Sequence, residues 1–212
     1  MNSRLVIESG ELEMNQKTVI QTFALFLTLA GIVAAMPFLW SLSARINASS
    51  VDSSHAGLEV GAALPELTGV GWLNGDGPKS GDLAGKVVVV HAFADFCPKC
   101  HRGMPNLVEL QHKYKERGVV FVGITTDGHE RQEADAQSEQ ISALKRYLKK
   151  YGADWPIAYG AIECLTAFKA EYIPGYWVIG RDGKVVYNKA STITMDEAID
   201  AALNEPTTKS DA

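Results

Sequence analysis

Cysteine is scarce in this chain, which has three cysteines among 212 residues. Two of them, Cys97 and Cys100, stand too close together to brace a fold, and an odd total argues against a framework of disulfides. Positive charge is not in excess either, because 20 Lys and Arg residues stand against 25 Asp and Glu residues. With a formal net charge of −5, a nucleic-acid partner is not expected.

Charge is absent between Lys17 and Arg45. The apolar part of this segment, Val19–Trp40, would be about 33 Å long as a helix at ~1.5 Å per residue, and the hydrocarbon core of a bilayer is about 30 Å thick. A cleaved secretory signal is the alternative, but its apolar region is shorter, about 7–15 residues. We therefore predict that residues 18–43 are a transmembrane anchor, or an uncleaved signal, in contact with the lipid bilayer.

The chain divides into segments on either side of this anchor. Residues 1–17 form a polar N-terminal tail, and the small polar residues 44–58 are typical of a flexible linker. From residue 59 to residue 205, strand and helix patterns alternate, and residues 206–212 are a C-terminal tail. The patterns predict strands at 87–94 and 119–126, helices at 104–117 and 141–151, a hairpin at 176–190 and a helix at 194–205. This order predicts one α/β domain with a mixed central sheet flanked by helices.

Turn and cap residues mark the ends of these elements. Gly118 and Gly152 are expected to end the two longer helices. The pair Asp182–Gly183 predicts the hairpin turn. Thr194 and Glu197 have the spacing of a capping box at the start of the last helix.

The pentapeptide CPKCH, residues 97–101, fits three kinds of chemistry. Read as C-x-x-C it is a dithiol redox switch, and read as C-x-x-C-H it is a haem attachment site. With Cys97, Cys100 and His101 as ligands it is also most of a zinc site, for which Cys164 is the only spare cysteine. A covalently bound haem needs a distal ligand and an apolar pocket, and it usually belongs to a helical fold.

The position of the motif favours the dithiol. It falls between a buried strand and an amphipathic helix, where unpaired N–H groups and the helix dipole favour a thiolate at Cys97. Pro98 suits the first helical turn because its missing N–H has no partner there. Lys99 adds a positive charge nearby. A metal or haem carrier using the CPKCH motif stays as the alternative.

Four stretches together resemble a known family. They are GAALPEL, then GDLAGKVVVVHAFADFCPKC, then Pro105 five residues after Cys100, and finally EYIPGYWVIGRDGKVV. In order and spacing they resemble the membrane-anchored TlpA/ResA-type branch of thioredoxin-like thiol-disulfide oxidoreductases. The resemblance covers about residues 59–204. Three positions depart from the family pattern: Phe96 replaces a usual Trp, Gly103 a frequent Glu, and Gly175 a usual Thr.

The resemblance implies a thioredoxin-like fold and a membrane-tethered enzyme on the periplasmic side. It implies a cis peptide bond between Ile173 and Pro174, in a loop that faces the dithiol and receives the substrate peptide. Cys97 would attack a disulfide of a client protein and Cys100 would resolve the mixed disulfide. The dithiol would need no further cofactor, and a membrane or periplasmic electron donor would reduce it again. Apocytochrome c is a client suggested by the family.

Several further residues near the motif have roles that the sequence leaves open. His91 either exchanges a proton with Cys100 or, as we favour, is a core histidine bonded to backbone. Asp95 is expected in an exposed loop, and Cys164 is expected to be a buried apolar residue rather than a third redox partner. Residues 127–140 are expected to be a solvated loop and the start of a helix.

Overall fold

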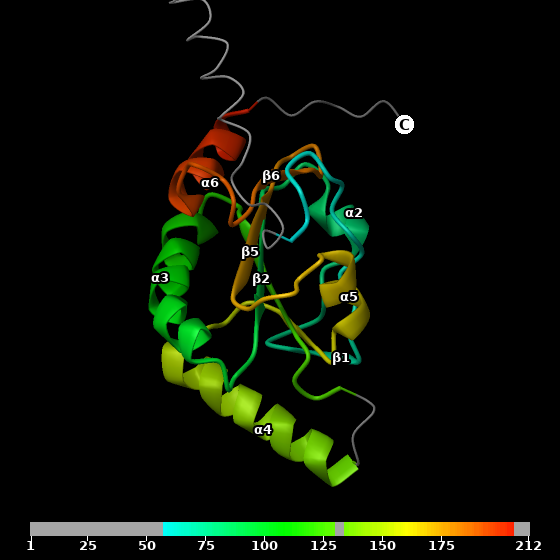
Figure 1. Cartoon of the computed structure of the whole chain (residues 1–212). Helices are drawn as coiled ribbons and strands as arrows, with labels where there is room; N and C mark the ends of the chain where they lie inside the picture. Colours follow the sequence, from blue (N-terminus) through cyan, green and yellow to red (C-terminus); the bar gives the residue numbers. More distant parts are fainter. Residues whose placement is uncertain (1–56, 130–133, 206–212) are drawn as a thin grey trace, which may run out of the picture. The chain divides into compact units, whose positions relative to one another are not determined.

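The computed structural model describes residues 57–129 and 134–205, which fold around one mixed sheet (Figure 1). The sheet has six strands in the order β1-β4-β3-β2-β5-β6. Its strands are β1 (Gly71–Leu73), β2 (Val88–Phe93), β3 (Val120–Thr125), β4 (Ile157–Tyr159), β5 (Gly175–Ile179) and β6 (Val185–Tyr187). Its helices are α2 (Ser80–Leu83), α3 (Pro98–Lys115), α4 (Ala134–Tyr151), α5 (Ile162–Ala167) and α6 (Met195–Asn204). The expected α/β class and mixed sheet are confirmed.

The central strand β2 carries the active-site motif at its carboxyl end. It pairs in parallel with β3 and antiparallel with β5. Every β2 residue is buried, since the sheet is covered on both faces. Val89 and Phe93 pack into a core with residues of α3, α4 and α6, whereas Val90 and Ala92 pack into a second core with residues of α5. Burial on both faces explains the unbroken apolar run in the sequence.

The two long helices end where the sequence predicts. Residues Gly118 and Gly152 have φ angles of 78° and 73°, a conformation that glycine adopts without steric cost. Along α3, the side chains of Met104, Leu107 and Tyr114 are fully buried against the sheet. The amphipathic pattern of the sequence therefore positions α3, and with it the motif at its first turn.

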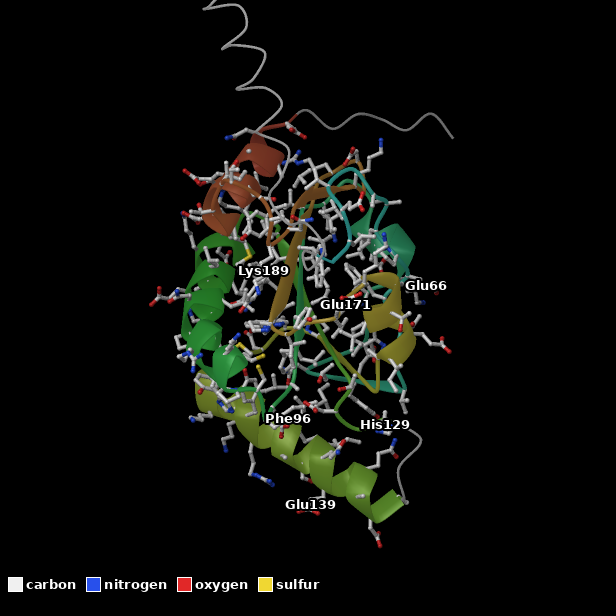
Figure 2. The ribbon with its side chains drawn as sticks, viewed as in Figure 1. Glu66, Phe96, His129, Glu139, Glu171 and Lys189 are labelled. Atoms are coloured by element: carbon white, nitrogen blue, oxygen red, sulfur yellow. The ribbon has the colours of Figure 1, made fainter. Side chains whose placement is uncertain are left out.

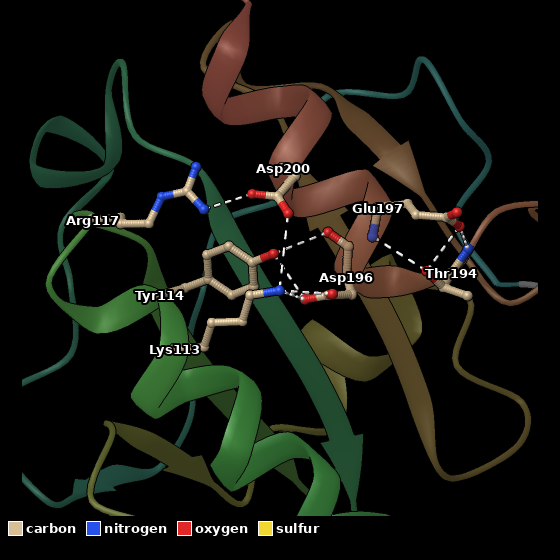
Figure 3. Close-up of polar contacts among 7 residues, drawn as sticks. All are labelled: Lys113, Tyr114, Arg117, Thr194, Asp196, Glu197 and Asp200. Atoms are coloured by element: carbon tan, nitrogen blue, oxygen red, sulfur yellow. Dashed lines mark hydrogen bonds and ion pairs between the residues drawn. The ribbon is translucent and has the colours of Figure 1, made fainter.

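The last helix, α6, is fixed at its start and along one side (Figure 3). Its N-cap Thr194 accepts a hydrogen bond from the backbone N–H of Glu197, which confirms the capping box. The side chain of Asp196 accepts hydrogen bonds from Lys113 and from the Tyr114 hydroxyl at the end of α3. A second carboxylate of α6 pairs with Arg117. These contacts join α6 to α3 at the end of α3 that lies away from the motif.

Some elements were not expected from the sequence. Strands β1 and β4 have three residues each and helix α5 has six, which is too short for a clear periodicity. The expectation that residues 127–140 begin with a solvated loop is wrong at Asp127. This carboxylate is 4% exposed and accepts the backbone N–H of Asp95 at 2.9 Å. The anchor predicted at 18–43 lies outside the described residues. Among the residues described, no helix is long and apolar enough to cross a membrane.

Candidate active site

The C-x-x-C pair occupies the first turn of α3. Cys97 is the N-cap residue, and its Sγ accepts a hydrogen bond from the backbone N–H of Cys100 at 3.2 Å. Cys97 is 7% exposed, whereas Cys100 is completely buried. Pro98 is the first helical residue, and the side chain of Lys99 is exposed between the two cysteines. The expectation that Cys97 lies at the helix start and Cys100 one turn deeper is confirmed.

The loop before β5 faces this turn. The peptide bond between Ile173 and Pro174 is cis, as the resemblance implied. The thiol of Cys97 points at the carbonyl oxygen of Ile173, with 3.9 Å between sulfur and oxygen. Next to these residues, Phe96 and Tyr172 are 73% and 56% exposed. The dithiol thus lies beside a loop carbonyl and directly after the exposed Phe96, which is labelled in Figure 2.

A groove extends from this loop towards α5. It has a volume of about 440 Å³. Its lining includes the apolar residues Ile173, Ile162 and Leu165 and the charged residues Lys169 and Glu171. The groove shares Ile173 with the loop whose carbonyl faces Cys97.

Burial controls the protonation of the deeper cysteine. Loss of solvent, followed by its hydrogen bond with Cys97, raises the pKa of Cys100 to about 12. Burial, and then an unfavourable charge interaction with Cys100, also raises the pKa values of Tyr147 and Tyr176. Cys100 therefore carries its proton at neutral pH, surrounded by neutral phenols.

His91 lies on β2, and its ring is stacked between Phe93 and Tyr176, with ring centroids 4.8 Å from each. Burial lowers the pKa of His91 to about 3, so the ring is neutral at physiological pH. Neither ring nitrogen has a hydrogen-bond partner among the described residues. The expected bond to backbone is therefore wrong, because β2 and β5 use their backbone groups in the sheet. Proton exchange between His91 and Cys100 stays a prediction.

Tyr176 has a place in the site that sequence reasoning missed. A Cβ atom added at Gly103 would lie 2.6 Å from the hydroxyl oxygen of Tyr176. Gly103 stands one helical turn after Cys100, so the phenol fills the space next to that turn. The only feature of the sequence that indicated this space was Gly103 itself, at a position where the family often has Glu. The missing side chain leaves room for a tyrosine hydroxyl from the neighbouring strand β5.

His101, the last residue of CPKCH, has both ring nitrogens engaged. Nδ1 lies 2.8 Å from the hydroxyl of Tyr151, and Nε2 lies 2.7 Å from the carbonyl oxygen of Asp95. Binding a metal or a haem iron through His101 would break one of these contacts. No group of three or more His, Cys, Asp or Glu side chains within 57–129 and 134–205 could hold a metal ion. Asp95 is half-buried rather than exposed as expected.

Cys164 lies on α5, on the other face of the sheet from the C-x-x-C pair. It belongs to the core formed with residues such as Val90 and Ala92, whereas Cys97 and Cys100 belong to the core beneath α3. Its side chain is 1% exposed, and burial raises its pKa. These observations agree with the expectation of a core residue.

A mixed sheet in this strand order, with a C-x-x-C pair at a helix start facing a cis-proline loop, defines the class of thioredoxin-like thiol-disulfide oxidoreductases. Within this class the chain belongs to the Redoxin family, which matches residues 59–203. It is an oxidoreductase with a redox-active C-x-x-C pair, and its activity implies protein clients that carry disulfides.

Individual relatives agree with this assignment. The chain is 29% identical over 130 residues to the thiol-disulfide oxidoreductase ResA of Bacillus anthracis, covering 61% of this chain and 68% of that protein. Protein DipZ of Mycobacterium tuberculosis is 29% identical over 168 residues, covering 77% of this chain but 22% of DipZ. The crystal structure of a thiol-disulfide isomerase from Corynebacterium glutamicum is 24% identical and has the same fold, with a TM-score of 0.56 over 68% of this chain and 98% of that chain.

Proposed function

We propose that this protein is a membrane-tethered reductant of disulfides in client proteins, with its thioredoxin-like domain (residues 59–205) on the periplasmic side. The observation that carries the proposal is the geometry of Cys97. Its sulfur accepts the N–H of Cys100, faces the carbonyl oxygen of Ile173 and keeps some contact with solvent. Tethering rests on the apolar segment at residues 18–43, followed by the linker at 44–58.

The first step is attack by the Cys97 thiolate on one sulfur of a client disulfide. A bond forms between Cys97 and that sulfur, the client disulfide breaks, and the second client sulfur leaves as a thiolate. The hydrogen bond from the Cys100 N–H and the field of the helix start favour negative charge on Cys97 before the attack. The carbonyl of Ile173 marks the side from which the client peptide approaches.

The second step releases the client. Cys100 loses its proton and attacks the sulfur of Cys97, and the first client sulfur leaves as a thiolate. The products are a reduced client with two thiols and a Cys97–Cys100 disulfide, so two electrons have passed to the client. An electron donor at the membrane or in the periplasm would then reduce the dithiol again. Because Cys100 is protonated at neutral pH, it must lose a proton before it can attack.

The family resemblance of the sequence indicates one client to test. This client is apocytochrome c, which contains C-x-x-C-H motifs of its own. The exposed Phe96 and the groove beside Ile173 would bind the chain around the client disulfide. Pro98, Lys99 and Pro174 would support the site by shaping the helix start, supplying charge and setting the facing loop.

Turnover of a peptide disulfide tests this proposal. With dithiothreitol as donor, the full chain in non-ionic detergent should accelerate reduction of the peptide, and the Cys97→Ser variant should show only the background rate. The matched control is Cys164→Ala, which should keep nearly full activity. Activity in the Cys97→Ser variant, or loss of activity in folded Cys164→Ala, would overturn the assignment.

A further inference from the structure

Positive charge is concentrated in two segments of this acidic chain. Residues 97–108 contain Lys99 and Arg102, residues 140–151 contain four Lys or Arg residues, and neither segment contains Asp or Glu. The whole chain, in contrast, has a net charge of −5.

The fold brings these two segments together at the dithiol. His101, in the first turn of α3, lies 2.8 Å from the Tyr151 hydroxyl at the end of α4, and its ring lies 4.8 Å from that of Tyr147. The Nζ of Lys150 lies 5.0 Å from the centre of the Tyr151 ring. Figure 1 shows α4 crossing beside the start of α3. The end of α4 that contains Lys150 therefore lies next to the turn that contains Cys97.

We call Lys99, Arg102, Arg146 and Lys150 the basic surface. All four side chains are exposed. The ion pairs of the described residues join other groups, such as Lys113, Lys115 and Arg117 with carboxylates, and include none of these four. Their charges are thus available to a partner.

Few carboxylates oppose the basic surface among the described residues near the site. Asp95 is half-buried, and Asp127 is buried and accepts a backbone N–H, with burial raising its pKa. Glu171 is exposed on the loop before Ile173, where it lines the groove, rather than on α3 or α4 (Figure 2). Positive charge therefore predominates on the side of the dithiol formed by the start of α3 and the end of α4, and it can steer a partner of the opposite sign.

We infer that the basic surface is a docking site for an acidic protein partner, whose disulfide is flanked by Asp or Glu residues. The inference rests on the proposed thiol-disulfide exchange at Cys97, because the partner must reach that sulfur. Attraction between the carboxylates of the partner and the basic surface raises the rate of encounter. The apolar ring of Phe96, 73% exposed beside Cys97, contacts the partner once it has docked. Charge thus adds selectivity that an apolar groove alone would not supply.

The test compares three peptides of equal length, each closed by one disulfide and flanked by Glu, Ser or Lys residues. The reduced full chain in non-ionic detergent would be mixed with each, and oxidation of its dithiol followed by stopped flow. At low ionic strength the Glu peptide should react about tenfold faster than the Lys peptide. The ratio should approach one in 1 M salt, where the screening length is about 3 Å.

Charge reversal on α4 keeps the dithiol itself unchanged. The Arg146→Glu/Lys150→Glu variant should lower the ratio of the Glu-peptide rate to the Lys-peptide rate by about threefold or more. The Ser peptide should react at the wild-type rate. The matched control is Lys86→Glu/Lys184→Glu, which makes the same change in charge. Both residues are exposed at the end of the sheet where β2 begins, opposite the dithiol. This control should leave the ratio near the wild-type value.

The outcomes separate this inference from the proposed function. Equal rates for the Glu and Lys peptides at low ionic strength, with the Ser peptide reduced normally, would overturn the docking site alone. Failure to reduce any peptide would overturn the proposed function and the docking site together. If the peptides react equally, and anionic vesicles slow the reconstituted wild-type chain but not the Arg146→Glu/Lys150→Glu variant, the surface binds lipid instead.

Discussion

Cys97 and Cys100 differ in burial and in their hydrogen bonds, although they stand on the same helical turn. Cys97 is 7% exposed and accepts an N–H, whereas Cys100 is fully buried with a pKa of about 12. The N–H and the helix start favour the attacking thiolate, and burial keeps the second thiol protonated. The division of roles between the two residues follows from this difference in environment.

His91 is a second residue whose environment sets its protonation. Its pKa of about 3 lies below the ordinary value of 6.5, so below pH 6.5 the unfolded chain binds a proton that the folded chain does not. Stability should therefore be fully present above pH 6.5 and fall as the pH drops towards 3, by about 1.4 kcal/mol per pH unit. Replacing His91 by Phe should remove this pH dependence. It also removes two buried nitrogens that have no hydrogen-bond partner among the described residues.

Urea unfolding of the full chain in detergent, at pH 7 and at lower pH, would measure the effect. Between pH 6.5 and pH 4 the free energy of unfolding of the wild type should fall by about 3 kcal/mol more than that of His91→Phe. His112→Phe, an exposed histidine on α3, is the control and should keep the wild-type slope. An unchanged slope in His91→Phe would show that another group causes the acid dependence.

At the scale of elements, strong periodic patterns were predictable and short elements were not. The buried run of β2 and the apolar stripe of α3 each have one interpretation, and glycines fix where α3 and α4 end. Strand β4 and helix α5 are too short to show a period, and their form depends on packing against β3. The spacing of the two cysteines predicted the dithiol. Tyr176, in contrast, approaches Gly103 from a strand that is distant in the sequence, and no local pattern reveals such a contact.

The contact between α3 and α6 makes a prediction at this scale. The Tyr114 hydroxyl donates to the Asp196 carboxylate at 2.8 Å, so Tyr114→Phe should destabilise the domain by about 1 kcal/mol. For a domain of this size the midpoint of thermal unfolding should fall by about 2–4 °C. Tyr187→Phe removes the same atom where no hydrogen bond is made within the described residues, and it should change the midpoint less. Equal shifts in both variants would contradict a stabilising role for this contact.

At the scale of the whole molecule, the apolar segment at 18–43 is predicted to hold the dithiol domain at a membrane. If Val19–Trp40 is an anchor, the full-length protein should stay in the membrane fraction through a carbonate wash, at its uncleaved mass. Western blotting of the washed membranes would measure this. A soluble form beginning near Ala44 would show that the segment is a cleaved signal.

The proposed mechanism depends most on the unequal roles of the two cysteines, which trapping of mixed disulfides tests directly. In the Cys100→Ser variant Cys97 can attack a client disulfide but nothing resolves the product, so mixed disulfides should accumulate on a non-reducing gel. In the Cys97→Ser variant the two remaining thiols, Cys100 and Cys164, are buried and have raised pKa values, and almost no mixed disulfide should form. Equal trapping by the two variants, or trapping by Cys97→Ser alone, would contradict the assignment of Cys97 as the attacking residue.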